Sequence, residues 1–247
     1  MKRIVSGIRA TGSLHLGNYI GAVQQWIRMV DSDPPADYLF FVADLHAITT
    51  PYDSASLADN TREITAAYIA SGLDVDKVTL FPQSAVPQHA YLQWLLSSIA
   101  SMGWLNRMTQ FKEKAGKHRD NASLSLYAYP VLQAADVLIY NATHVPVGED
   151  QKQHIELARD IANSFNHRYD TDLLVEPEPI IMEEGARIMS LLDGTGKMSK
   201  TADSDMTRIN MTDDADSIAK KIRKAKTDPL PVPETAEDMD ARPKRKT

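Results

Sequence analysis

Short apolar runs alternate with helix-like segments along most of this sequence. The runs Ile4–Ser6, Tyr38–Ala43, Val78–Phe81 and His144–Val147 have the length and composition of buried β-strands. Residues 38–43 are apolar throughout, as expected of a strand that is covered on both faces. This alternation predicts an α/β fold in which a doubly wound parallel sheet carries helices on both faces. The expected helices fall at residues 17–30, 54–71, 88–100, 124–140 and 150–165.

Composition sets outer limits on size and location. A chain of 247 residues, 43% of them hydrophobic, is long enough for one large domain with a sizeable core, or for one domain and an appendage. The formal net charge of −6 argues against a general nucleic-acid coat but leaves room for a local basic patch. The sequence contains no cysteine, which excludes disulfides and thiolate metal sites. It also has no run of 18 apolar residues, so we expect no membrane-spanning helix and a cytoplasmic location.

A glycine-containing turn and the start of a helix follow the first expected strand. Residues 11–18 read Thr-Gly-Ser-Leu-His-Leu-Gly-Asn. Gly12 and Gly17 allow the backbone to approach a ligand closely, and a helix that begins near Gly17 directs free N–H groups toward it, which favours phosphate. His15 and Asn18 can donate hydrogen bonds to phosphoryl oxygens. The alternative interpretation is an ordinary strand-to-helix turn with an exposed histidine.

A second segment with phosphate chemistry lies late in the chain. Residues 196–201 read Gly-Lys-Met-Ser-Lys-Thr and follow the apolar run 188–192. The ammonium groups of Lys197 and Lys200 can follow negative charge onto a leaving pyrophosphate. A solvated loop with two lysines is the alternative. Together with His15, which is 182 residues before Lys197, the loop indicates a catalyst that spreads charge over a nucleoside triphosphate.

These two segments resemble the two signatures of the class I aminoacyl-tRNA synthetases, and longer segments resemble the tryptophanyl branch. The longer matches are residues 11–22, 44–49, 107–114 and 145–159, and the resemblance covers about residues 3–226. It implies a Rossmann-like catalytic nucleotide-binding domain at residues 1–201. The start of a helical tRNA-binding region would follow at residues 202–228, and a polar linker and tail at residues 229–247. Family members continue further with a helical region, so the resemblance describes a chain that lacks most of this region.

The resemblance also implies a reaction and its partners. L-Tryptophan and ATP, with Mg2+ carried by the nucleotide, would give tryptophanyl-adenylate, and the acyl group would pass to tRNA(Trp). The attacking carboxylate is already ionised, so no general base is expected, and no dedicated metal site is expected either. Family members are homodimers, and the apolar helices after Pro87 would supply a face with Tyr91, Trp94, Leu95 and Leu96. Packing of these residues in the core of the chain itself is the alternative. With the helical region missing, we expect tRNA charging to be weakened more than adenylate formation. The alternatives are a tyrosine-activating sibling and a truncated paralogue that binds tryptophan or a partner without turnover.

Asp136 is the residue that the resemblance places at the indole. It lies within an otherwise apolar helix, and a buried carboxylate that accepts the indole N–H would reject phenylalanine, because the acceptor would then be unpaired. The other tryptophan-site residues that the resemblance implies are Val5, His46, Tyr129, Gln133, Val145, Val147 and Gln151. The implied catalytic residues are His15, Asn18, Lys114, Lys197 and Lys200. The implied ATP contacts are Arg9, Thr11, Gly12, Gly17, Asn18, Asp150, Ile188, Met189, Lys197, Met198, Ser199 and Lys200.

Two departures and one basic cluster qualify the comparison. Arg9 and Ala10 stand where most family members have Gln-Pro, which adds a charge to a loop that approaches ATP. Thr201 replaces the usual serine and retains a hydroxyl. The helix expected at residues 214–226 ends in five lysine and arginine residues, which we interpret as a solvated face, with contact to tRNA phosphates as the alternative.

Overall fold

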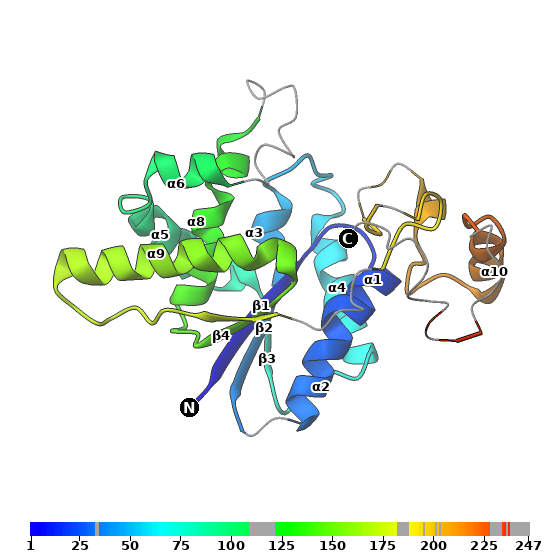
Figure 1. Ribbon diagram of the computed structural model, residues 1–247, viewed down its shortest axis with the longest axis horizontal. Coiled ribbons are helices and arrows are strands. Elements are labelled where there is room, and N and C mark those ends of the chain that lie inside the picture. Colours follow the sequence, from blue (N-terminus) through cyan, green and yellow to red (C-terminus); the bar gives the residue numbers. More distant parts are fainter. Residues whose placement is uncertain are drawn as a thin grey trace. The chain divides into compact units, whose positions relative to one another are not determined.

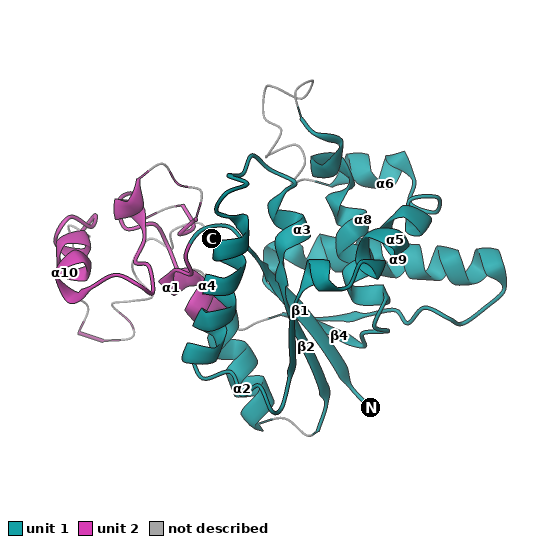
Figure 2. Cartoon of the chain, turned by 180° about the vertical axis from the view of Figure 1, so that it is seen from behind, with its two compact units in different colours: residues 1–12, 22–183 teal, residues 13–21, 184–247 magenta. Residues whose placement is uncertain are grey.

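The computed structural model divides the chain into two compact units. The first unit holds residues 1–12 and 22–183, and the second holds residues 13–21 and 184–247 (Figure 2). Within them, the structure describes residues 1–32, 35–108, 122–181, 188–194, 196–200, 202, 204–227, 234–235 and 237. This division places the His15 segment in the second unit, although it follows the first strand directly. The division into domains at residues 201 and 228 stays a prediction.

A five-stranded parallel sheet forms the centre of the first unit. Its strands are β1 (Arg3–Arg9), β2 (Asp37–Ala43), β3 (Thr79–Pro82), β4 (His144–Val147) and β5 (Glu178–Ile181). Their order is β3-β2-β1-β4-β5, and every pairing is parallel. The chain therefore winds outward from β1 in one direction and then returns to continue on its other side. This confirms the predicted doubly wound α/β fold, and the reversal between β1 and β4 is where such sheets usually bind ligands.

The helices of the first unit pack on both faces of this sheet (Figure 1). On one face, Trp26 stacks on Phe40 at 4.5 Å between ring centroids and meets Tyr68 edge-on at 5.4 Å. Phe41, the next residue of β2, joins a separate apolar cluster with Val137 and Ile155. Successive side chains of a strand point to opposite faces, so β2 anchors helices on both sides. The described helices of this unit are α2 (Gln24–Ser32), α3 (Asp44–Ala47), α4 (Leu57–Ala70), α5 (Gln88–Leu96), α6 (Met102–Arg107), α8 (Leu124–Leu138) and α9 (Lys152–Tyr169).

The helix predicted at residues 17–30 is wrong in detail. The structure has a short α1 (Leu16–Asn18), a π-helical turn at Tyr19–Val23, and then α2. The change of helix type falls where the chain passes from the second unit into the first. Residue periodicity cannot distinguish these forms, because α and π turns differ by less than one residue per turn over so short a length.

The second unit is held together by pairing between distant segments. His15 forms an antiparallel bridge with Asn210, and Met189 forms one with Lys197. The unit also contains a 3-10 turn at Asp205–Thr207 and the helix α10 (Ala215–Arg223), which Asp214 caps by accepting from the Ser217 amide at 2.7 Å. The predicted polar helix at residues 214–226 is therefore present in shorter form, and the tail predicted beyond residue 229 lies mostly outside the described residues.

Candidate active site

His15 is held in one orientation by its own turn. It caps α1, where its Nδ1 accepts from the Asn18 amide at 3.2 Å. In return, the Asn18 side-chain oxygen accepts from the His15 amide at 3.4 Å. This reciprocal arrangement is a capping box with histidine in the place of serine. Because Nδ1 is an acceptor here, the proton of a neutral imidazole is on Nε2, where it can be donated to a ligand.

Burial and nearby cations keep His15 neutral. Burial is the largest influence, followed by the charges of Lys200, Arg208 and Lys197, and together they lower the pKa of His15 to about 4. At neutral pH the imidazole is therefore an uncharged donor. The influence of both signature lysines on His15 also means that the two segments share one local environment within the second unit.

The lysine loop is closed by its own backbone hydrogen bonds, and it adjoins the His15 turn through Met198. The Met198 amide donates to the Ile188 carbonyl at 2.8 Å, and the Ser190 amide donates to the Gly196 carbonyl at 2.7 Å. The Met198 side chain is buried, and a Cβ added to Gly17 would lie 3.5 Å from its Cβ. The two segments, far apart in sequence, thus pack against each other within the second unit, and Met198 serves as an anchor of the loop.

Asp136, in the first unit, is the centre of a buried polar network. The residue is 1% exposed. Its Oδ1 lies 2.6 Å from Gln83 Nε2 and 2.6 Å from His89 Nδ1, and its Oδ2 lies 2.7 Å from His46 Nε2. An ionised carboxylate has about four acceptor positions, two on each oxygen. The described residues occupy three of them, and the fourth belongs to Oδ2.

The partners of Asp136 are themselves held in place. The Leu45 amide donates to Gln83 Oε1 at 3.1 Å, which fixes the Gln83 amide with its NH2 toward the carboxylate. His89 Nε2 lies 2.7 Å from the Tyr140 hydroxyl. Burial and the charge of Asp136 raise the pKa of Tyr140 to about 12, so the hydroxyl keeps its proton beside His89.

Asp136 stays ionised despite its burial. Desolvation alone raises its pKa, but the charge of His46 and the hydrogen bonds from His46 and His89 outweigh it, and the pKa lies below the ordinary value. The network therefore presents a charged, immobile acceptor. The sequence alone did not indicate Gln83 or His89. The one sequence signal concerns Gln83, which directly follows β3 at the carboxyl end of a parallel strand, where ligands commonly bind.

Comparison with known proteins identifies the family. The model of the class I tRNA synthetases for W and Y matches residues 1–245. The chain belongs to this family. A tryptophan–tRNA ligase of Caulobacter vibrioides is 59% identical over 241 residues, which are 97% of this chain and 69% of that protein.

Solved structures agree with this assignment. The tryptophanyl-tRNA synthetase of Mycoplasma pneumoniae matches with a TM-score of 0.84 and 39% identity, over 93% of this chain and 66% of that one. The tryptophanyl-tRNA synthetase of Campylobacter jejuni, complexed with ADP and tryptophan, matches with a TM-score of 0.80 and 34% identity. The match covers 93% of this chain and 69% of that one. The chain thus spans about two thirds of the length of these relatives.

In this synthetase, the other residues predicted to contact tryptophan lie in the first unit. Val5, Val145 and Val147 are buried in the same apolar cluster as Val137, the residue after Asp136. The Tyr129 hydroxyl lies 3.1 Å from His154 Nε2, and the Tyr129 ring meets the His46 ring edge-on at 6.2 Å between centroids. Gln133 is half-buried one turn beyond Tyr129 on α8. Gln151 is half-buried and its Nε2 donates to Asp150 Oδ2 at 3.2 Å.

The predicted ATP contacts are distributed over both units. Arg9, Thr11, Gly12 and Asp150 belong to the first, whereas Gly17, Asn18 and residues 188–200 belong to the second. Gly12 has φ +57°, a left-handed conformation that explains the glycine, since an added Cβ would meet nothing within 4 Å. Arg9 is the last residue of β1. Its pKa is lowered, because burial outweighs the opposite effect of the charge of Tyr129.

The remaining predicted positions have different outcomes. Met189 is half-buried and pairs with Lys197, and Ser199 is half-buried in the lysine loop. Lys114 and Thr201 lie outside the described residues. Among the described residues, no helix has both the length and the apolar character needed to cross a membrane.

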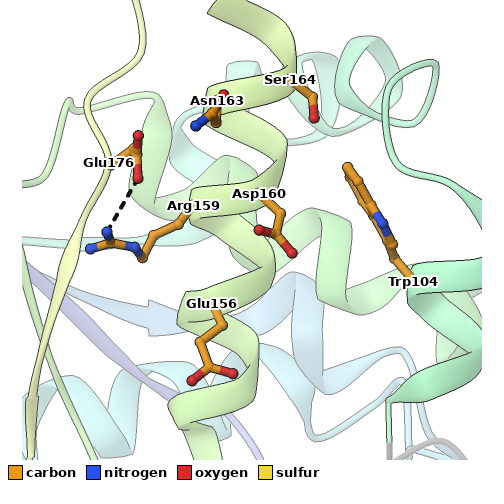
Figure 3. A pocket seen from close by; sticks show the side chains of 7 residues that line it. All are labelled: Trp104, Glu156, Arg159, Asp160, Asn163, Ser164 and Glu176. Carbon is orange, nitrogen blue, oxygen red and sulfur yellow. Dashed lines mark ion pairs between the residues drawn. The ribbon is translucent and has the colours of Figure 1, made fainter.

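A polar hollow along α9 is separate from these predicted residues. It is lined by Trp104, Glu156, Arg159, Asp160, Asn163, Ser164 and Glu176 (Figure 3). Arg159 pairs with Glu176 at 3.3 Å across it. None of the residues predicted to bind tryptophan or ATP is among its lining, so the hollow has no part in the candidate active site.

Proposed function

We propose that this synthetase activates L-tryptophan with ATP and transfers the product to tRNA(Trp). The tryptophan carboxylate oxygen attacks the α-phosphorus, a mixed carboxylic–phosphoric anhydride bond forms, and the bond from the α-phosphorus to the bridging oxygen of pyrophosphate breaks. Tryptophanyl-adenylate and pyrophosphate result, and the adenylate is then consumed by a terminal ribose hydroxyl of tRNA. The observation that carries the proposal is the buried, ionised Asp136 with one acceptor position left, in a chain 59% identical to a tryptophan–tRNA ligase.

Charge stabilisation is the role of the second unit in this reaction. The attacking group is already an anion, so positioning and electrostatics supply most of the rate, as in phosphoryl transfer generally. His15 donates from Nε2, Asn18 adds a neutral donor, and Lys197 and Lys200 follow the charge onto pyrophosphate. Mg2+ enters with ATP as part of the substrate. Lys114 is proposed to contribute a further positive charge to the phosphates.

Recognition of tryptophan is the role of the first unit. The open position on Asp136 Oδ2 accepts the indole N–H, and Val5, Val145 and Val147 supply apolar contacts to the ring. Phenylalanine has no such donor, so its binding leaves a desolvated charged acceptor unpaired. A site built around a polar group discriminates in this way by large factors, whereas an apolar pocket alone does not. His46, Tyr129, Gln133 and Gln151 are proposed to hold the rest of the amino acid.

The synthetase is further proposed to be a cytoplasmic homodimer. Tyr91, Trp94 and Leu95 lie on one face of α5, where Trp94 is 75% exposed. An exposed aromatic and aliphatic patch of this kind is typical of an interface, and the proposed occupant is a second copy of the chain. Leu96, which the sequence placed on the same face, is instead buried in the core of the first unit. Light scattering of the Trp94→Lys variant tests this: loss of a dimer supports it, and a monomeric wild type refutes it.

Tryptophan-dependent exchange of pyrophosphate into ATP is the decisive test of function. We expect exchange with tryptophan and none with tyrosine or phenylalanine at the same concentration. Tyrosine-dependent exchange would favour the tyrosine-activating sibling, and absence of exchange with either amino acid would favour a non-catalytic protein. Charging of tRNA(Trp), measured in parallel, tests the transfer step separately.

A further inference from the structure

One lysine of the basic helix α10 is not on a solvated face. Lys221 is 4% exposed, whereas its neighbours Lys220 and Arg223 are exposed. Its Nζ lies 2.6 Å from Asp205 Oδ2 and 2.6 Å from Asp213 Oδ2. Burial lowers the pKa of Lys221, but the bonds to the two carboxylates outweigh it, and the pKa is raised. The ammonium group is thus a permanent charge inside the second unit.

The two carboxylates that bind Lys221 converge on one further residue. Asp213 Oδ2 also accepts from the Asn210 amide at 2.9 Å, and Asp205 Oδ1 accepts from Asn210 Nδ2 at 2.8 Å. Both the backbone and the side chain of Asn210 are therefore fixed by groups that Lys221 holds. Arg208 adds an ion pair with Asp205 at 3.1 Å.

Asn210 is the strand partner of His15. The bridge between them is flanked by two backbone hydrogen bonds, from the Leu16 amide to the Ile209 carbonyl at 2.9 Å and from the Met211 amide to the Leu14 carbonyl at 2.8 Å. The same stretch reaches the segment that precedes the lysine loop, because the Leu191 amide donates to the Thr207 carbonyl at 2.9 Å. Residues 205–213, which we term the bridging segment, therefore bond to the His15 turn and to the segment that precedes the lysine loop.

We propose that Lys221 is a positioning residue for His15, acting through Asp205, Asp213 and the bridging segment. The inference rests on the proposed function, since it assumes that His15 binds the nucleotide. The pair with Asp213 is the stronger part, because the Asp213 side chain is 12% exposed whereas that of Asp205 is 53% exposed and solvent-screened. Removing a buried charge leaves its partners uncompensated, so the segment loses its fixed position.

The variant Lys221→Met tests this with Lys220→Met as its matched control. Methionine keeps the apolar stem and removes only the charge, and the control makes the same change on the exposed face. The first readout is the pKa of His15, which an NMR titration measures without any turnover. In the wild type and in Lys220→Met we expect a pKa of about 4. In Lys221→Met it should rise toward the ordinary histidine value, because His15 leaves its buried place beside Lys197, Lys200 and Arg208.

The second readout separates the two substrates. In pyrophosphate exchange, Lys221→Met should raise the KM for ATP by about tenfold, the low end of the loss seen when a supporting residue is removed. The KM for tryptophan should stay unchanged. A purely structural role would lower the apparent kcat through the fraction of folded protein and would leave both KM values unchanged, and far-UV circular dichroism measures that fraction.

Several outcomes overturn the proposal. The proposal is wrong if a folded Lys221→Met variant keeps the wild-type His15 pKa and the wild-type KM for ATP. It is also wrong if Lys220→Met changes the His15 pKa and the KM for ATP as much as Lys221→Met does. If Lys221→Met does not fold, Asp213→Asn replaces it, since asparagine keeps an oxygen for the Asn210 amide and loses the charge that pairs with Lys221. An unchanged His15 pKa in that variant refutes the proposal. Absence of exchange in the wild type would refute the proposed function alone, because the His15 titration would still report on Lys221.

Discussion

Replacement of Asp136 by asparagine tests the acceptor role of this side chain with the smallest change of shape. An asparagine amide has one oxygen and one NH2 group, so only one of its sides can continue to accept. The Oδ1 side faces Gln83 and His89, and Gln83 cannot reverse because the Leu45 amide binds its oxygen. Among the described residues the Oδ2 side faces only His46, whose Nε2 can take either role in a hydrogen bond. The asparagine oxygen will therefore face Gln83 and His89, and its NH2 will face His46.

This orientation places a donor where the indole N–H requires an acceptor. A hydrogen bond to a charged group contributes about 1.5–3 kcal/mol, and all of it is lost when two donors meet. At about 1.4 kcal/mol for each factor of ten, the KM for tryptophan should rise roughly 10- to 150-fold. The fold should survive, because the three existing partners keep neutral hydrogen bonds. Loss of their charge assistance should lower the free energy of unfolding by about 1–3 kcal/mol.

The assay is pyrophosphate exchange with tryptophan varied at saturating ATP, alongside thermal unfolding. The KM for ATP should stay at its wild-type value, since none of the hydrogen bonds of His15 or of the lysine loop involves Asp136. Asp160→Asn, the same change on an exposed position of α9, is the control and should alter neither constant. A folded Asp136→Asn variant with the wild-type KM for tryptophan would remove Asp136 from the site.

Three further predictions concern stability. Gly7→Ala should lower the free energy of unfolding in urea by about 1–3 kcal/mol, because the added Cβ would lie 2.6 Å from the ring of Phe41 on β2. The control Gly103→Ala in α6 should be neutral or slightly stabilising, and equal effects of the two variants would contradict this packing. The lowered pKa of Asp136 means that its ionised form stabilises the fold above the unfolded pKa of about 3.9 and that this stabilisation disappears as the pH falls through the folded pKa. The stability difference between wild type and Asp136→Asn should therefore shrink in acid, and a growing difference would reverse the assigned sign. Tyr140→Phe should cost about 1–2 kcal/mol in thermal unfolding, because His89 Nε2 loses its hydrogen-bond partner; an unchanged melting temperature would mean that this bond contributes nothing.

The sheet was predictable because its strands are short apolar runs in a regular alternation with helices. The run 144–147 coincides with β4, and the run 38–43 differs from β2 by one residue. β5 was missed, since Glu178–Ile181 contains a proline and has no apolar periodicity. Its strand character comes from pairing with β4, which is a contact between distant parts of the chain. Helix α6 was missed as well, because six residues provide too little periodicity to recognise.

The candidate site was predictable where a local motif carries the chemistry. The His15 turn and the lysine loop each have a recognisable spacing, and the structure brings them together within the second unit. The environment of Asp136 was not predictable in the same way. The sequence suggested a lone carboxylate in an apolar helix, whereas three donors from separate elements surround it. A buried charge requires such partners, but neither their identity nor their position follows from the residues next to it in the sequence.

His15 in the second unit and Asp136 in the first have different charge states that suit their proposed ligands. The triphosphate is already strongly negative, so a neutral histidine among lysines can donate to it without first competing for a proton at neutral pH. The indole N–H is a weak, uncharged donor, and a charged acceptor strengthens the one hydrogen bond that it can make. Each of these residues therefore has a fixed protonation state before any ligand arrives. Burial beside cations keeps His15 neutral, and hydrogen-bond donors that outweigh burial keep Asp136 ionised. A site prepared in this way requires no proton transfer when its substrates bind, which is consistent with a reaction whose nucleophile is already ionised.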